Sequence, residues 1–229
     1  TLKQNENRRL MNCNGKELDL SKPVVMGILN VTPDSFYNKG RNSSRDEIII
    51  RAIEMIGEGA SILDIGGQST RPRAAMISAQ EEMDRVLPVI ESIHEKFPST
   101  ILSIDTFRSE VAEAAIIAGA DIINDISGGE LDTNMIDVVF KLKVPYICMH
   151  MQGTPETMQE NPYYSNVVQE VYAYFEQKIN HFHSLGLKDI ILDPGFGFGK
   201  SLEHNLKMLA DFDQFSQLGY PVLAGISRK

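Results

Sequence analysis

The chain has 229 residues, of which 42% are apolar and 23% are charged, and its formal net charge is −9. This length and composition are ordinary for one α/β domain of a globular protein. The negative charge argues against general nucleic-acid binding, and no apolar run reaches the length of about 18 residues that suggests a membrane span. The polar start lacks a signal-peptide pattern, and the distant Cys13 and Cys148 favour free thiols, so we expect a cytoplasmic protein.

The first predicted element is a small β-hairpin within residues 8–20. Two short alternating runs flank Asn14 and Gly15. An Asn-Gly pair between such runs is a strong hairpin signal. We expect this hairpin to precede the main fold and to belong to one domain that covers residues 1–229.

Seven apolar runs predict buried strands, and six amphipathic stretches predict helices. The expected strands are residues 24–29, 61–64, 100–104, 121–123, 144–149, 189–192 and 220–224. The expected helices are residues 45–59, 78–97, 109–118, 133–142, 165–185 and 202–215. Strands that alternate with helices indicate a parallel sheet, either an open doubly wound sheet or a (β/α)8 TIM barrel.

Polar residues at the ends of all seven strands favour the barrel. These residues are Asn30, Asp64, Asp105, Asn124, His150, Asp193 and Ser227. A barrel brings the carboxyl ends of all its strands to one mouth, whereas an open sheet concentrates its site at one switch point. Because the sequence stops just after the seventh run, we expect strand eight and its helix to be missing and the domain to be incomplete at its C-terminus.

The stretch from Asp193 to Lys200 combines a carboxylate with alternating glycines and phenylalanines. Asp193 follows an apolar run, so it is expected where a strand ends. Pro194 stands where a phosphate-binding loop would need glycine, which argues against a nucleoside triphosphate site. A carboxylate beside aromatic rings suits a flat heterocycle with an N–H edge, although a helix-capping role for Asp193 is also open.

Several motifs in the same order resemble those of the dihydropteroate synthases. They are residues 26–36 (MGILNVTPDSF), 64–72 (DIGGQSTRP), 103–106 (SIDT), 123–125 (IND), 149–152 (MHMQ), 193–200 (DPGFGFGK) and 225–229 (GISRK). The resemblance covers residues 24–229. It implies a (β/α)8 barrel, in agreement with the independent prediction from strand ends.

The resemblance also implies a reaction. The family condenses 6-hydroxymethyl-7,8-dihydropterin pyrophosphate with p-aminobenzoate to give 7,8-dihydropteroate and pyrophosphate, assisted by Mg²⁺, in folate biosynthesis. It implies a homodimer as well.

The family motifs imply roles for particular residues. Asn30 corresponds to the metal contact and, with Arg71 and Lys229, forms the expected catalytic set. The expected substrate-binding residues are Thr70, Asp105, Asn124, Met149, Asp193, Phe198 and Lys229.

Some positions depart from the family pattern. Gln68 stands where many relatives have Glu, Arg73 where many have Gly, and residues 37–39 (YNK) replace a more acidic, glycine-rich continuation. These departures bear on p-aminobenzoate binding rather than on the reaction class. The alternatives are a pterin-binding methyltransferase barrel that acts on methyltetrahydrofolate, and an inactive pterin-binding module.

Overall fold

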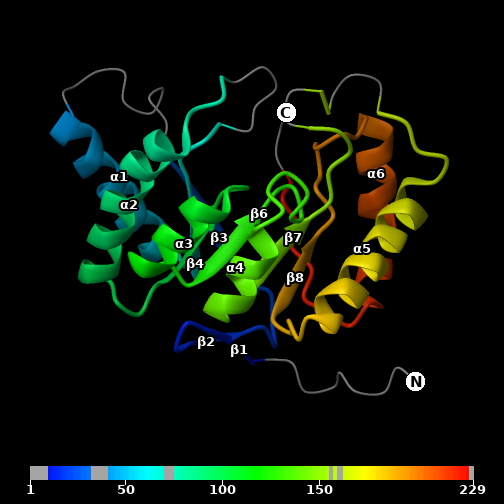
Figure 1. The fold of residues 1–229 in the computed structure, drawn as a ribbon, viewed down its shortest axis with the longest axis horizontal. Coiled ribbons are helices and arrows are strands. Elements are labelled where there is room, and N and C mark those ends of the chain that lie inside the picture. The colour runs from blue at the N-terminus through cyan, green and yellow to red at the C-terminus, as the bar shows by residue number, and fades with distance from the viewer. Residues whose placement is uncertain (1–9, 32–40, 70–74, 155–156, 159–161, 227–229) are drawn as a thin grey trace.

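The computed structural model describes residues 10–31, 41–69, 75–154, 157–158 and 162–226, and its centre is a six-stranded parallel sheet with helices around its outer side (Figure 1). The strands pair in chain order, which is the order that a barrel requires. They are β3 (Met26–Asn30), β4 (Ile62–Gly66), β5 (Ile101–Asp105), β6 (Ile122–Asp125), β7 (Tyr146–Met149) and β8 (Ile190–Asp193).

Five helices lie between consecutive strands, as the sequence predicts, and α6 and α7 follow β8. They are α1 (Arg41–Gly57), α2 (Ala79–Lys96), α3 (Ser109–Ile117), α4 (Met135–Leu142), α5 (Val167–Ser184), α6 (Leu202–Ala210) and α7 (Asp213–Ser216). The predicted capping residue of α2 is present, because the Ser78 hydroxyl accepts a hydrogen bond from the Glu81 N–H. None of the helices in the described part of the chain is long and apolar enough to cross a membrane.

The stretch 202–215 was expected to be one helix, and the structure corrects this to two. Helix α6 ends at Ala210 and α7 begins at Asp213. The break places the Phe212 ring 6.1 Å from the Phe196 ring, while Phe215 is fully buried. Burial of these rings against the core outweighs one longer helix, because each large aromatic residue buries much apolar area.

The seventh predicted strand is reduced to a single bridge between Leu192 and Val222. Leu192 N–H donates to the Pro221 carbonyl and Leu223 N–H donates to the Leu192 carbonyl, at 2.9 and 2.8 Å. The run therefore lies beside β8, in the position of the next barrel strand. Pro221 has no N–H, which limits the number of ladder hydrogen bonds that the run can make.

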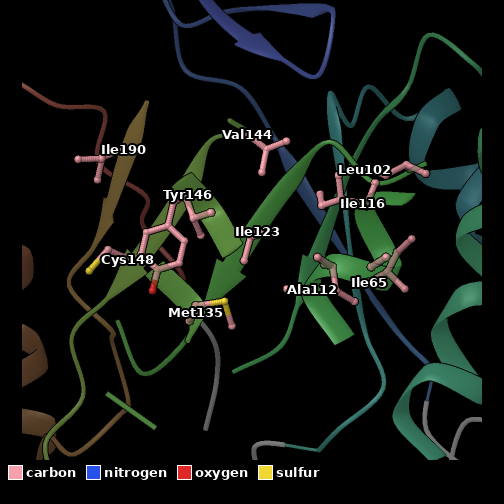
Figure 2. Packing of buried hydrophobic residues seen from close by; sticks show 14 of the residues in the cluster. Ile65, Leu102, Ala112, Ile116, Ile123, Met135, Val144, Tyr146, Cys148 and Ile190 are labelled. Atoms are coloured by element: carbon pink, nitrogen blue, oxygen red, sulfur yellow. The ribbon is translucent and has the colours of Figure 1, made fainter. Parts of the chain in front are cut away.

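Side chains alternate between the two faces of the sheet, as strand geometry requires. The outward set packs against the helices and forms the main core. Figure 2 shows part of it, with Ile65, Leu102 and Ile123 from the strands close to Ala112 and Ile116 of α3. The inward set forms layers inside the barrel, and these layers position the site.

The first inward layer is apolar and is covered by the predicted hairpin. This hairpin is present as β1 (Leu10–Cys13) and β2 (Lys16–Asp19), with Asn14 and Gly15 at positive φ in its turn. It lies across the amino ends of the strands (Figure 1). The buried cluster there contains Met11, Cys13 and Leu18 of the hairpin and Ile62, Ile101, Ile122, Ile147 and Ile191 of the sheet.

Candidate active site

The second inward layer carries most of the polar residues of the site. It contains the residue two positions after each isoleucine of the first layer: Asp64, Ser103, Asn124, Met149 and Asp193. The neighbouring strands place Asp64 opposite Ser103 and Met149 opposite Asp193. The alternation of side chains therefore points these residues, from five strands, toward the interior of the barrel.

The carboxyl ends of β3 to β6 add a row of aligned residues. The register pairs Asn30 with Gly66, Gly66 with Asp105, and Asp105 with Asn124. Three residues of the expected site, from three strands, thus stand in one row at the mouth. Asn30 is exposed there, while Asp105 and Asn124 are half-buried.

Asp64 holds the amide of Asn124 from inside the barrel. Asn124 Nδ2 donates to Asp64 Oδ2 at 3.0 Å. A carboxylate accepts only, so this hydrogen bond fixes which end of the amide faces it. Asp64 Oδ1 and Ser103 Oγ are buried with no hydrogen-bond partner among the described residues. Buried polar atoms are normally paired, so these two indicate room for a polar ligand or water.

Burial dominates the electrostatics of the mouth. It raises the pKa of Asp64 to about 6, while the hydrogen bond from the Asn124 amide favours the ionised form. Burial also raises the pKa of Asp105 well above its usual range, and the negative charges of Asp64 and Glu82 add to this rise. A carboxylate whose pKa is raised is a strong hydrogen-bond acceptor. A group of such carboxylates therefore suits a neutral ligand that donates hydrogen bonds from one edge.

Asp193 ends β8 and is joined to the glycine-rich loop. Its Oδ1 accepts a hydrogen bond from the Gly195 N–H at 2.8 Å. Burial raises the pKa of Asp193 to about 6, while this hydrogen bond and the charge of Lys200 lower it. A Cβ on Gly199 would lie 2.6 Å from the Gln152 carbonyl oxygen, so only glycine allows the loop to approach the segment after β7.

A small apolar cluster forms one wall of the mouth. Met149 is buried in it beside Phe107 and Ile126, and the half-buried Phe198 packs against it. The two expected apolar contacts of the substrate, Met149 and Phe198, therefore belong to one wall. Phe196 does not share it, because this ring packs against the main core beside Phe212.

Two buried residues of this region lie in sequence features singled out above, but they were not among the expected site residues. Lys200 is only 3% exposed and His150 is 8% exposed. Lys200 Nζ lies 3.0 Å from His150 Nδ1, so the two side chains meet between β7 and the glycine-rich loop. Burial and the Lys200 charge lower the pKa of His150 to about 3, which keeps the imidazole neutral. The sequence signal for Lys200 was its place directly after three alternating glycines.

Three residues of the expected site lie outside the described residues. They are Thr70, Arg71 and Lys229, so their roles stay predictions. Gln68, which departs from the family pattern, is described and buried. Its Nε2 donates to the carbonyls of Ser69 and Ala75, and its Oε1 accepts from the Ile77 N–H at 3.0 Å. Gln68 thus joins the two ends of the segment that carries Thr70 and Arg71.

The donor set at the mouth fits a magnesium ion only together with a substrate. No group of three or more His, Cys, Asp or Glu side chains in the described parts of the chain could hold a metal ion. Mg²⁺ prefers oxygen ligands, keeps several waters and commonly binds through substrate phosphates. The exposed Asn30 at the end of β3 offers one amide oxygen, which is compatible with such binding.

The parallel strands and the acidic mouth at their carboxyl ends define the class of barrel enzymes whose site lies at that face. Residues 26–229 match the family model described as "Pterin binding enzyme". Dihydropteroate synthase of Haemophilus influenzae is 49% identical over 218 residues, covering 94% of this chain and 78% of that protein.

Solved structures agree with this assignment. Dihydropteroate synthase of Xanthomonas albilineans with 4-aminobenzoic acid has a TM-score of 0.89 and 41% identity, over 96% of this chain and 79% of that one. The same enzyme in complex with 7,8-dihydropteroate has a TM-score of 0.85 and 39% identity, over 96% and 78% of the two chains. The chain belongs to the pterin-binding enzyme family, among the dihydropteroate synthases, and its fold is that of their TIM barrel.

Proposed function

We propose that this chain joins 6-hydroxymethyl-7,8-dihydropterin pyrophosphate to p-aminobenzoate, giving 7,8-dihydropteroate and pyrophosphate in folate biosynthesis. The observation that carries the proposal is the layer of buried carboxylates and amide at the strand ends, in a chain 49% identical to a dihydropteroate synthase. Both proteins compared above are synthases, which favours this reaction over the methyltransferase alternative.

The pterin is proposed to bind by its flat N–H edge against Asp105, Asn124 and Asp193. Carboxylate oxygens accept such donors, and hydrogen bonds to charged groups are worth about 1.5–3 kcal/mol each. Asn124 is held by Asp64, so its amide is already oriented before the ligand arrives. The apolar wall with Met149 and Phe198 would cover one face of the rings.

The bond change takes place at the exocyclic carbon of the pterin. The p-aminobenzoate nitrogen attacks this carbon, the C–O bond to pyrophosphate breaks, and the nitrogen loses a proton. Arg71 and Thr70 are proposed to hold the pyrophosphate, and Lys229 to contact the pterin. Asn30 would hold Mg²⁺, which supplies positive charge to the leaving oxygens when it is bound. A homodimer and a cytoplasmic location stay predictions.

The reaction is tested directly with purified protein. Dihydropteroate and pyrophosphate should form in equal amounts from the two substrates, and product should depend on both. Formation of neither product, with intact pterin binding, would leave a binding module as the better description. Transfer of a methyl group from methyltetrahydrofolate to a corrinoid would favour the methyltransferase alternative.

The order of binding gives a second test. The pterin pocket is built from strand ends, which the barrel holds in place. We expect the pterin pyrophosphate to bind first and to complete the site for the aromatic amine. Isothermal titration should show p-aminobenzoate binding only with a pterin and pyrophosphate present. Tight binding to the empty protein would contradict this order.

A further inference from the structure

Lys200 lies buried beneath the mouth, and none of the roles proposed above uses it. Its ammonium donates to the main-chain oxygens of Phe198, Gly195 and His150 at 2.9, 3.0 and 3.2 Å. It also lies 3.0 Å from His150 Nδ1. Burying a charge costs several kcal/mol, roughly, before its partners compensate. A lysine in this position therefore calls for an explanation beyond packing.

The Gly195 peptide connects Lys200 to Asp193. Its carbonyl accepts from Lys200 Nζ at 3.0 Å, and its N–H donates to Asp193 Oδ1 at 2.8 Å. Gly195 has φ +69°, and an added Cβ would lie 2.1 Å from the His150 carbonyl oxygen. Only glycine can occupy this place. Lys200 thereby fixes the donor that holds one oxygen of the Asp193 carboxylate.

Charge acts across the same peptide. The negative charge of Asp64 adds to the burial that raises the pKa of Asp193 to about 6, and the Lys200 charge lowers this pKa. Asp105 is a further acidic group of the mouth, and the Asp193 charge raises its pKa in turn. His150 is neutral across this range because its pKa is lowered to about 3. Burial lowers the pKa of Lys200 itself to about 7, while the Asp193 charge raises it, so Lys200 carries its charge in the acidic part of this range. Among these described neighbours, Lys200 is the group that favours the ionised form of Asp193 by its charge there.

We propose that Lys200 is a positioning residue for Asp193. It holds the Gly195 peptide against the carboxylate and supplies the positive charge that keeps this carboxylate ionised, so that Asp193 accepts hydrogen bonds from the pterin. The inference rests on the proposed function, because it assumes that Asp193 contacts the pterin edge. It also predicts that the pH dependence of pterin binding changes when Lys200 is replaced. A purely structural lysine would not have this effect.

The test is isothermal titration with 6-hydroxymethylpterin between pH 5 and pH 8. Lys200→Met removes the charge and the donors, while Lys200→Gln removes the charge and retains amide donors for the loop carbonyls. Lys178→Met is the control, because Lys178 is a partly buried lysine that also donates to a glycine carbonyl, that of Gly128, at 2.9 Å. Both Lys200 variants should move the acid midpoint of binding upward by about one pH unit, a tenfold change in proton affinity, and the control should not.

A double-mutant cycle separates action through Asp193 from general damage. If Lys200 acts through this carboxylate, Lys200→Gln should lose much less pterin affinity in an Asp193→Asn background than in the wild type. A carbon-13 titration of the Asp193 carboxyl in the ligand-free Lys200→Gln protein should show the same upward shift. This last measurement decides the matter even if Lys200→Met does not fold.

Two other results of these titrations would contradict the inference. If the Lys200 variants keep the wild-type acid midpoint and lose the same pterin affinity at every pH, the inference is overturned and Lys200 has a structural role only. A wild-type protein that binds no pterin at any pH would overturn the proposed function, and this inference with it. The two failures are therefore distinguishable in one set of titrations.

Discussion

The two ends of the barrel interior are built from opposite chemistry on the same strands. At the amino ends, five isoleucines meet the apolar side of the β1–β2 hairpin and form a buried apolar cluster. Two residues further along each strand, the interior carries Asp64, Ser103, Asn124, Met149 and Asp193. The comparison teaches that one end stabilises the fold, while the other retains buried polar groups that cost stability and suit a ligand.

The polar contacts of the closed end serve to fix the hairpin. Lys16 Nζ donates to Asp121 Oδ2 and to the Thr100 carbonyl, both at 2.7 Å. Asp121 Oδ2 also accepts from the Leu102 N–H at 2.8 Å. Each of these groups is thus paired, in contrast to the unpaired Asp64 Oδ1 at the open end. Changes at the two ends should therefore separate stability from pterin affinity.

The largest expected effect is on stability, from a change in the closed end. Leu18→Ala empties part of the buried cluster, where Leu18 is 3% exposed, and should lower the free energy of unfolding by about 3 kcal/mol. Urea unfolding measures this loss. Pterin affinity should stay within about twofold, since closed-end and mouth changes at distant sites act independently. Leu10→Ala is the control, because Leu10 lies on the same hairpin and is 56% exposed. Equal losses of unfolding free energy for the two variants would contradict a stabilising role for the buried side of the hairpin.

The second effect is on binding, from a change in the open end. Asp193→Asn replaces an acceptor oxygen by a donor and should weaken pterin binding by about 2 kcal/mol, roughly thirtyfold, in isothermal titration. The fold should be retained, because the change removes a buried charge. Asp121→Asn is the control at the closed end, and it should lower stability without changing pterin affinity. Unchanged affinity of Asp193→Asn would remove this residue from the proposed site.

The smallest effect concerns the pH dependence of stability. The folded state raises the pKa of Asp64 and Asp193 from 3.8 to about 6, so it binds protons more tightly than the unfolded state does. The stability that these groups contribute is present at low pH and is lost as pH rises through about 6. The pKa of each group is 3.8 in the unfolded chain and about 6 in the folded protein, so urea unfolding of the ligand-free protein should show this contribution being lost as pH rises from about 4 to about 7.

The matched variant for this test is the double change Asp64→Asn and Asp193→Asn. It removes both carboxyls from the open end and leaves the closed end intact. Relative to the wild type, the variant should lose less stability as pH rises from about 4 to about 7. His150, whose pKa is lowered from 6.5 to about 3, acts in the opposite direction in both proteins, so the difference between their curves reports the two carboxyls. Curves of equal slope would show that the mouth carboxyls do not titrate in this range.

The sequence alone was sufficient for the hairpin, the alternation of strands and helices, and the barrel. Each of these depends on local signals: the Asn14-Gly15 pair, apolar runs of strand length, and polar residues where the runs end. The residues expected at the mouth, Asn30, Asp105 and Asn124, were found by the same reasoning. They stand in one row because parallel strands in register align their carboxyl ends.

A repeated signal in the sequence was missed. Each buried isoleucine of the closed end is followed two positions later by the residue that faces the open end, as in Ile62-Leu-Asp64 and Ile122-Ile-Asn124. The runs read as uniformly apolar because their outward residues pack against helices. The spacing of two was visible, but which of the two faces points inward depends on how the sheet curves.

Only the tertiary structure decided the partners of the buried charges. Lys200 and Asp193 are seven positions apart, yet what relates them is the peptide of Gly195 and the neighbouring strand end at His150. The contact of Asp64 with Asn124 likewise joins residues 60 positions apart. Local sequence indicates strands and turns because its signals, the period of apolar residues and the turn-forming residues, lie within a few positions of each other. The ionisation of a buried carboxylate depends on burial and on charges brought together by the fold, which no local pattern specifies.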